Sequence, residues 1–227
     1  MNSSMYEILM GLPLFTGVSR DCISQIFEKY NFHFLKYLPG EQIVMAGETC
    51  THIKFVISGS VRSRIENADG RFKVSQTLNA PEVIAPEFLF GKATQYPCTV
   101  TAIEPTRILQ ISKAEYMEIL KSDQIFMFNL LNILSLNAQR SIEGVLSMTT
   151  GSLEERIAFW ITALTQNGGT DIVLTCKQRD LYALFGVQRT SFIATLDNMM
   201  ERGIIEYDAN EIKVISRRDL LKLLNAI

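Results

Sequence analysis

The sequence predicts an α+β protein: an antiparallel β-roll first, then a long helix, then a winged helix-turn-helix. Three observations support this. Short apolar segments separated by Gly and Pro fill residues 32–111, a helical period without proline runs from 122 to about 148, and a single glycine, Gly186, breaks two short amphipathic helices. We therefore divide the chain into a roll domain with N-terminal helices (1–121), a dimerisation helix (122–149) and a winged-helix domain (150–227).

The first part of the chain changes from a helical to a strand-like pattern. Residues 5–30 carry apolar side chains at helical spacing, interrupted by Leu12-Pro13-Leu14-Phe15. Many short strands with Gly and Pro turns then favour an antiparallel sandwich or barrel of the jelly-roll type. The expected strands are Phe32–Leu38, Ile43–Met45, Ile53–Ile57, Val61–Ile65, Phe72–Leu78, Glu82–Ala85, Thr99–Ile103 and Arg107–Ile111.

The long helix is expected to begin at Ser122, a residue type that caps helices. Apolar and small residues follow at alternating spacings of three and four, which is typical of a coiled-coil seam. A second apolar stripe (Phe126, Leu130, Ile133, Ile142) can cover the chain's own roll, leaving the seam for a second copy of the chain; a helix buried in a monomer is the alternative. The seam comprises Leu131, Leu134, Ala138, Ser141, Val145 and Met148.

After the long helix, Thr149-Thr150-Gly151-Ser152 is expected to end one helix and cap the next, Arg156 to Leu164. A short strand, Ile172–Leu174, precedes the two-helix element, residues 176–196, which Gly186 breaks in two. Segments Gly203–Tyr207 and Glu211–Ile215 then form a hairpin around Asp208-Ala209-Asn210. A helix-turn-helix followed by such a hairpin is a winged helix, whose wing can contact the DNA backbone beside the groove.

The second helix of this element opens with four polar residues that can bond base edges or phosphates. Residues 151–227 contain nine Lys or Arg against ten Asp or Glu, so attraction to phosphate must come from a local cluster: Lys177, Arg179 and Arg189, joined by Lys213, Arg217 and Arg218. We expect Arg189 to read guanine, Thr190 and Thr195 to be secondary base readers, and the others to contact phosphate. The candidate DNA-binding residues are Lys177, Arg179, Gln188, Arg189, Thr190, Ser191 and Thr195.

The order of these parts resembles the Crp/Fnr family of bacterial transcription regulators across nearly the whole chain. The segments that carry the resemblance are Leu12–Phe15, Leu38–Ile43 with Gly47-Glu48, Phe55–Val61, Thr99–Ala102 and Arg156–Ala158. The resemblance implies a homodimer that binds an effector in its roll and a roughly palindromic double-stranded DNA site with its paired recognition helices. RNA polymerase is a further partner that it implies.

Two motifs depart from the family's pattern. Its nucleotide binders carry a Gly-Glu pair and, about ten residues later, an Arg with Ser or Thr; this chain has Ala85-Pro86 and Tyr96-Pro97. Proline has no N–H and tyrosine does not replace an arginine, so we expect no tight cyclic AMP or GMP binding. The recognition helix usually reads Arg-Glu-Thr-Val-x-Arg; here Thr190 replaces the Glu and Ala194 the second Arg, which predicts a different half-site.

The effector is left open by the sequence. The roll either holds an effector in an apolar, aromatic pocket or has that pocket closed by its own side chains, which would leave a constitutive regulator. Haem on His33, His52 or Cys98 and a redox switch at Cys98 are further alternatives. The candidate pocket residues are Pro86, Glu87, Phe88, Tyr96, Cys98 and Ser141.

Several classes of protein are disfavoured. No Ser/His/Asp, metal-ligand or glycine-rich phosphate motif indicates an enzyme or a metal site. The four cysteines form no CxxC pair, no apolar run reaches membrane-spanning length, and the N-terminus lacks a signal-peptide pattern, so we expect a cytoplasmic protein with reduced thiols. The competing function is a dimeric binding module whose winged helix contacts protein rather than DNA.

Overall fold

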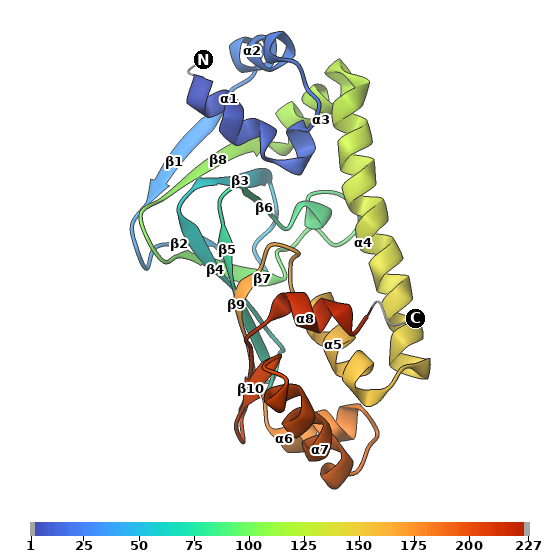
Figure 1. The fold of residues 1–227 in the computed structure, drawn as a ribbon. Helices are drawn as coiled ribbons and strands as arrows, with labels where there is room; N and C mark the ends of the chain where they lie inside the picture. The colour runs from blue at the N-terminus through green and yellow to red at the C-terminus, as the bar shows by residue number, and fades with distance from the viewer. Residues whose placement is uncertain (1–2, 225–227) are drawn as a thin grey trace. The chain divides into compact units, whose positions relative to one another are not determined.

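The computed structural model describes the backbone of residues 3–224, with the side chains in that range except those of 3–5, 140, 144 and 147–150 (Figure 1). The chain forms two compact units, and each is described by itself. Unit 1 comprises residues 1–62 and 78–137, and unit 2 comprises 63–77 and 138–227.

The helices of unit 1 flank its strands in the chain. They are α1 (Ser3–Met10), the 3-10 turn η1 (Pro13–Phe15), α2 (Arg20–Lys29), α3 (Lys113–Ser122) and the first half of α4 (Gln124–Thr150). The expected cap at Ser122 is wrong, because Ser122 is the last residue of α3 and its hydroxyl donates to the Ile119 carbonyl (2.7 Å). Asp123 caps α4 instead, accepting the Ile125 N–H at 2.9 Å.

The strands of unit 1 form the predicted antiparallel roll. One sheet has the order β1-β8-β3-β6, and β2 pairs with β7. Inward-facing residues such as Phe55, Ile108 and Val100 are completely buried, and Phe15 packs edge-on against Phe55 and Phe126. The strands that lie wholly in this unit are β1 (His33–Tyr37), β2 (Gln42–Val44), β3 (His52–Ser58), β6 (Glu82–Ile84), β7 (Cys98–Ala102) and β8 (Thr106–Ser112).

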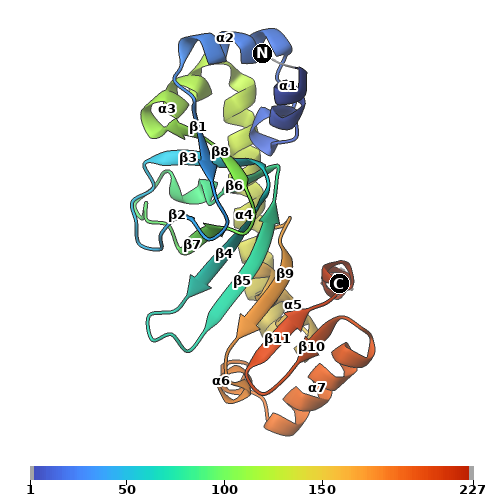
Figure 2. The same cartoon turned by 90° about the vertical axis from the view of Figure 1, so that its left-hand side faces the viewer.

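Unit 2 contains the predicted winged helix. Helix α5 (Leu153–Ala163) begins with a complete capping box, in which Ser152 and Glu155 exchange side-chain-to-backbone bonds. Its other elements are β9 (Thr170–Thr175), α6 (Gln178–Leu184), α7 (Arg189–Glu201), β10 (Ile205–Tyr207), β11 (Glu211–Val214) and α8 (Arg217–Lys222). Figure 2 shows strands β9, β11 and β10 side by side.

Unit 2 also includes a hairpin from the first half of the sequence. Strands β4 (Ser60–Glu66) and β5 (Lys73–Asn79) enter it, and β5 pairs with β9 in an antiparallel ladder that places Val74 opposite Leu174. Both side chains are buried in the core of this unit. The winged helix is therefore completed by a segment that lies about a hundred residues earlier, a boundary that differs from the division at 149/150.

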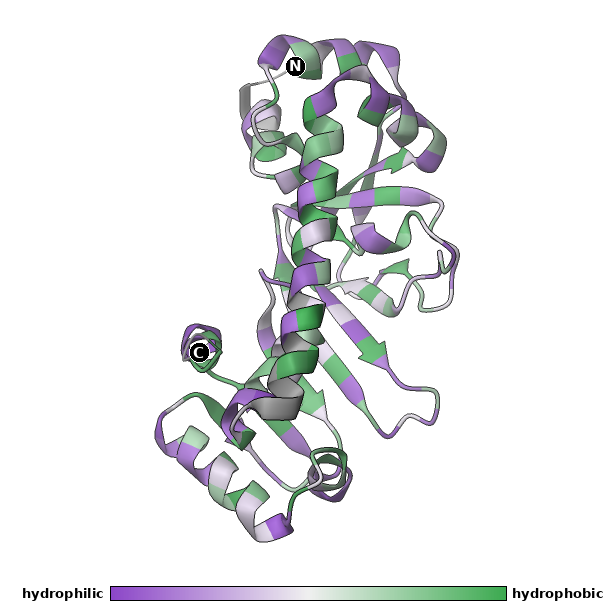
Figure 3. Ribbon diagram, turned by 90° about the vertical axis from the view of Figure 1, so that its right-hand side faces the viewer, coloured by the Kyte–Doolittle hydropathy of each residue, from purple (hydrophilic) through white to green (hydrophobic). Residues whose placement is uncertain are grey.

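Helix α4 has one buried and one exposed apolar face. Phe126 and Leu130 are buried, whereas Leu131 is 51% and Val145 67% exposed. Ile142, which the sequence placed on the covered stripe, is 64% exposed and lies on the open face. Figure 3 shows apolar residues recurring along the side of α4 that it turns toward the viewer.

The remaining seam residues lie on the same helix. Leu134 is half-buried, Ala138 and Ser141 are exposed, and the side chain of Met148 lies outside the described residues. Among the helices that the structure describes, none is long and apolar enough to cross a membrane.

Candidate nucleic-acid interface

Helices α6 and α7 form the helix-turn-helix that the sequence predicts. Gly186 lies between them with a φ of +64°, a backbone conformation that glycine adopts without strain. Phe192, Leu196 and Met199 recur at helical spacing on α7 and are completely buried. Burial of this face fixes the rotation of α7 about its axis and turns its first polar residues toward solvent.

The predicted reading residues fall at the start of α7. Gln188, which precedes the helix, and Arg189, Thr190 and Ser191 in its first turn are all exposed. Thr195, one turn later, is half-buried, and its hydroxyl donates to the Ser191 carbonyl at 2.9 Å. The structure therefore brings four of the predicted residues together, while the donor of Thr195 is already used within the helix.

The predicted cations divide into two groups. Lys177 and Arg179 are exposed at the start of α6, although Arg179 Nε lies 3.7 Å from a carboxylate oxygen of Asp180. Arg217 is not available for phosphate, because its guanidinium donates to Thr165 Oγ1 (2.9 Å) and to the Gly169 carbonyl (3.5 Å). Including it in the basic cluster is wrong: it is a structural residue that ties α8 to the segment after α5.

Arg156 stabilises the turn between the two helices, a role that the sequence did not predict. Its guanidinium lies over the Phe185 ring, 5.6 Å from the centroid, and Nη2 donates to the Phe185 carbonyl at 2.5 Å. The only sequence signal was its place in the segment Arg156-Ile157-Ala158. This contact joins α5 to the end of α6 and so to the start of α7.

The wing hairpin is tied to α7 by a tyrosine. The Tyr207 hydroxyl donates to a carboxylate oxygen of Asp197, and this bond raises the pKa of Tyr207 to about 12, with burial adding to the effect. In the wing itself Glu206 stands opposite Lys213 in the β10–β11 pair, and Asp208 and Glu211 are also exposed. The wing thus offers phosphate more negative than positive charge, which leaves the start of α7 as the main contact surface.

The predicted effector residues of unit 1 lie largely inside the roll. Pro86 begins a 3-10 turn (η2, Pro86–Phe88) after Ala85, which has a φ of +44°. Tyr96 is 2% exposed, and its hydroxyl donates to the His52 carbonyl at 3.1 Å. Burial raises the pKa of Tyr96 far above its usual range, so the group stays neutral.

The other members of this set differ in accessibility. Cys98 is buried, Phe88 is half-buried and Glu87 is exposed, while Ser141 belongs to unit 2. Three side chains of unit 1 (Pro86, Tyr96 and Cys98) thus fill space within the roll.

Known proteins resemble the roll by itself and also most of the chain. Residues 34–123 match the cyclic nucleotide-binding domain. The cAMP-activated global transcriptional regulator Vfr of Pseudomonas aeruginosa is 22% identical over 196 residues, which cover 82% of this chain and 91% of Vfr. The roll is thus similar to a cyclic nucleotide-binding domain, and most of the chain is similar to a transcription regulator.

Solved structures show the same fold. The Thermus thermophilus catabolite activator protein aligns with a TM-score of 0.52 at 21% identity, over 94% of this chain and 98% of its own. The sensor domain of the transcriptional regulator DNR from Pseudomonas aeruginosa aligns with a TM-score of 0.52 at 20% identity, over 60% of this chain and 90% of its own. The first alignment covers nearly the whole chain, so the two proteins share the order of their folded parts.

The candidate haem and redox ligands differ in their surroundings. His33 is exposed on β1, whereas Nδ1 of His52 lies 2.8 Å from the Thr51 hydroxyl. Burial, together with Lys54, lowers the pKa of His52. In the part of the chain that the structure describes, no three His, Cys, Asp or Glu side chains come together as metal ligands.

Cys50, Cys98 and Cys176 are buried, and all four cysteines are free thiols. Burial raises the pKa of Cys176 to about 12 and that of Cys50 in the same direction, so both favour the unreactive protonated form.

Proposed function

We propose that this protein is a Crp/Fnr-type transcription regulator that binds a roughly palindromic double-stranded DNA site as a homodimer, with α7 of each protomer in the major groove. The supporting observation is the first turn of α7, where Arg189, Thr190 and Ser191 are exposed while Phe192 and Leu196 behind them are completely buried. A helix held rigidly by its apolar face and polar at its exposed N-terminus suits base recognition.

Each reading residue has a definite chemical role. Arg189 donates two bonds to guanine O6 and N7, which is the most common specific contact of arginine with DNA. Gln188 and Ser191, together with Lys177 and Arg179 at the start of α6, contact phosphates and fix the position of the helix. Thr190 stands where the family usually has a glutamate, so the preference for a cytosine amine is lost and the half-site differs.

The open face of α4 supplies the dimer contact. Its exposed apolar side chains, including Leu131, Ile142 and Val145, form one stripe along the helix. Pairing of this stripe with its copy removes it from water and places two recognition helices on one DNA. A symmetric dimer in turn requires two half-sites about 34 Å apart.

The roll works without a cyclic nucleotide. Between Ala85 and Pro97 the only cation is Lys92, which is exposed, and two prolines supply no N–H to a phosphate. The Tyr96 hydroxyl donates to the protein's own backbone, so it is not aimed at a ligand. The residues present therefore do not fit the phosphate of cyclic AMP or GMP, and the effector is a different molecule or the regulator is constitutive.

Selection of bound sequences from a pool of random duplexes tests the DNA proposal with the full chain. We expect an enriched, dyad-symmetric site whose half-sites contain a guanine. Loss of enrichment in Arg189→Ala, with retention in Arg107→Ala on the roll, would support the assignment. Failure of the natural chain to enrich any sequence would refute DNA recognition and favour a winged helix that contacts protein.

Two measurements test the effector proposal. Calorimetric titration with cyclic AMP should give no binding, and a low-micromolar Kd would overturn the statement that the roll does not hold a cyclic nucleotide. Native mass spectrometry of the purified dimer separates the two remaining options, because a retained effector adds a discrete mass to the chain and a constitutive regulator shows none.

A further inference from the structure

The β4–β5 hairpin is built into the DNA-binding unit rather than resting on it. Its strand β5 pairs with β9, and Val74 is 2% exposed within the core of unit 2. Gln76 Oε1 accepts the Gln166 N–H at 2.9 Å, and a Cβ on Gly169 would lie only 2.1 Å from that oxygen. A larger residue at position 169 would have to displace the Gln76 side chain, so the segment after α5 is fitted to the hairpin as it stands.

A series of aromatic rings connects this hairpin to the recognition helix. Phe72 lies 4.9 Å from Trp160 of α5, and Trp160 meets Phe185 edge-on at 5.8 Å. Phe185 stacks on Phe192 of α7 at 6.2 Å, and Phe192 is completely buried. Because close-packed interiors transmit displacement rather than absorb it, a shift of the Phe72 ring should shift α7 as well.

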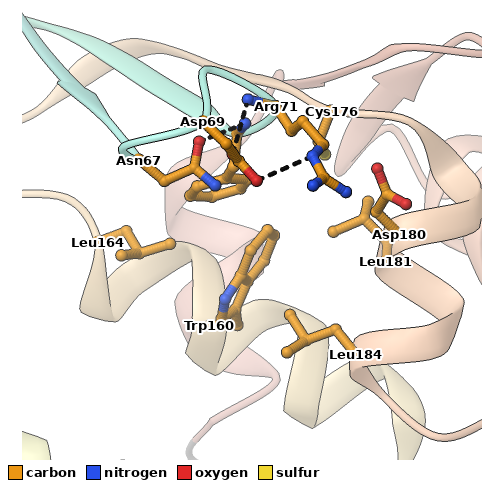
Figure 4. Close-up of a pocket in the computed structure, with 10 residues that line it drawn as sticks. Asn67, Asp69, Arg71, Trp160, Leu164, Cys176, Asp180, Leu181 and Leu184 are labelled. Atoms are coloured by element: carbon orange, nitrogen blue, oxygen red, sulfur yellow. Dashed lines mark hydrogen bonds and ion pairs between the residues drawn. The ribbon is translucent and has the colours of Figure 1, made fainter.

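The first ring pair lies at the edge of an open pocket. This pocket, of about 380 Å³, lies beside Phe72 and Trp160, and Figure 4 shows Trp160 below the hairpin loop, with Arg71 of that loop bonded to Asp69. Leu164, Leu181 and Leu184 also line the pocket. At this end of the hairpin the Phe72 ring is thus a principal link to the helices, since open space separates other parts of the loop from them.

We propose that Phe72 is a positioning residue for DNA recognition, and that the hairpin acts on α7 through the rings of Trp160 and Phe185. The same hairpin begins and ends in the roll, at Ser60 and Asn79, so it is a second covalent connection between the roll and the DNA-binding unit besides α4. This inference rests on the proposed DNA-binding function. It assigns part of that function to residues that a winged helix defined as 150–227 would omit.

Phe72→Ala in the full chain tests the proposal with the duplex obtained by selection. We expect affinity for this duplex to fall on the order of tenfold, while affinity for an unrelated duplex stays within about twofold. Phe72→Tyr, which keeps the ring, should restore binding. Phe34→Ala, which removes an exposed phenylalanine from β1 of the roll, is the matched control and should bind as the natural chain does.

A double-mutant cycle separates positioning from general loss of structure. If Phe72 acts through the first turn of α7, Phe72→Ala should have almost no further effect in an Arg189→Ala background, because the contact that it orients is already absent. A full further loss in that background would overturn the proposal. So would equal losses on the selected and unrelated duplexes, or no loss on either.

The natural chain provides a test that does not depend on folding of a variant. Trp160 is the only tryptophan, and it contacts both neighbouring rings of the series. Saturating amounts of the selected duplex should shift its emission, and unchanged emission would overturn the proposal. Selection of bound duplexes by the natural chain tests DNA recognition separately. If Phe72→Ala binds the selected duplex as the natural chain does, the role of Phe72 is refuted and the proposed DNA binding is not.

Discussion

Arg189→Ala is the most informative perturbation of the proposed interface. Arg189 is exposed in the first turn of α7, directly before the buried face that begins at Phe192. Because its side chain does not contribute to the core, the substitution should leave the fold and the dimer intact. What it removes is the proposed bidentate donor to guanine, so the loss should concern specific DNA binding.

The size of the loss follows from the symmetry of the proposed dimer. One bidentate arginine–guanine contact contributes about 1–3 kcal/mol of discrimination against the wrong base. A homodimer presents Arg189 twice, so about 2–6 kcal/mol is lost on a palindromic site. This corresponds to an affinity lower by roughly 30-fold to more than 10⁴-fold. Binding to unrelated duplexes, which depends on phosphate contacts, should fall much less.

Fluorescence anisotropy with labelled duplexes at several salt concentrations measures this effect. Lys177→Ala is the informative comparison. Loss of a phosphate contact should weaken binding to all sequences alike and should reduce the slope of log K against log salt by about one per contact. Arg107→Ala on β8 removes an exposed arginine from the roll and is the matched control. Circular dichroism and sedimentation should show that all three variants stay folded and dimeric.

One result would refute the reasoning about α7. If Arg189→Ala keeps the sequence preference of the natural chain and loses only salt-dependent affinity, then Arg189 contacts phosphate and another residue reads the base. Thr190 would be the next candidate, because it is the exposed residue that follows Arg189.

Further predictions concern the dimer, the wing and the roll. Val145→Asp should dissociate the dimer in sedimentation experiments by placing a charge in the α4 stripe, whereas Leu38→Asp, at an exposed leucine of the roll, should not; a dimeric Val145→Asp would place the interface elsewhere. Since Asp197 raises the pKa of Tyr207 from 10.0 to about 12, the stabilisation is complete below pH 10 and is lost as the pH rises toward 12. Urea unfolding should show that Tyr207→Phe removes this pH-dependent loss, and an equal loss in the variant would contradict the assignment. Gly59→Ala should lower the free energy of unfolding by about 1–3 kcal/mol, because φ is +86° there and a Cβ would lie 2.7 Å from the Pro105 carbonyl oxygen; an unchanged urea midpoint would show that the turn relaxes.

Local sequence patterns predicted the elements of the roll and of the winged helix well. Apolar alternation placed the strands of the roll close to their observed positions, and the capping box at Ser152 marked the start of α5. The glycine between α6 and α7 adopts the left-handed conformation that a tight turn requires. These features depend on neighbouring residues, whose spacing the sequence displays directly.

Side-chain assignments were less predictable because burial partners come from distant segments. Nothing near Arg217 in the sequence indicates that its guanidinium bonds to Thr165, and the sequence alone counted it as a surface cation. The sequence suggests Tyr96 as a ligand contact, but in the structure its hydroxyl donates to the His52 carbonyl. In each case an acceptor more than forty residues away decides the role.

The sequence by itself determined the fold class, the helix-turn-helix and the residues that open its second helix, because helical period, capping and turn residues act over a few positions. Only the tertiary structure decided that residues 63–77 belong to the same compact unit as the winged helix. The ladder between β5 and β9 joins strands about a hundred residues apart, and the contacts of Phe72 and Gln76 exist only once the ladder has formed. Such pairing is selected by the fit of whole surfaces, for which a single sequence carries no local signal.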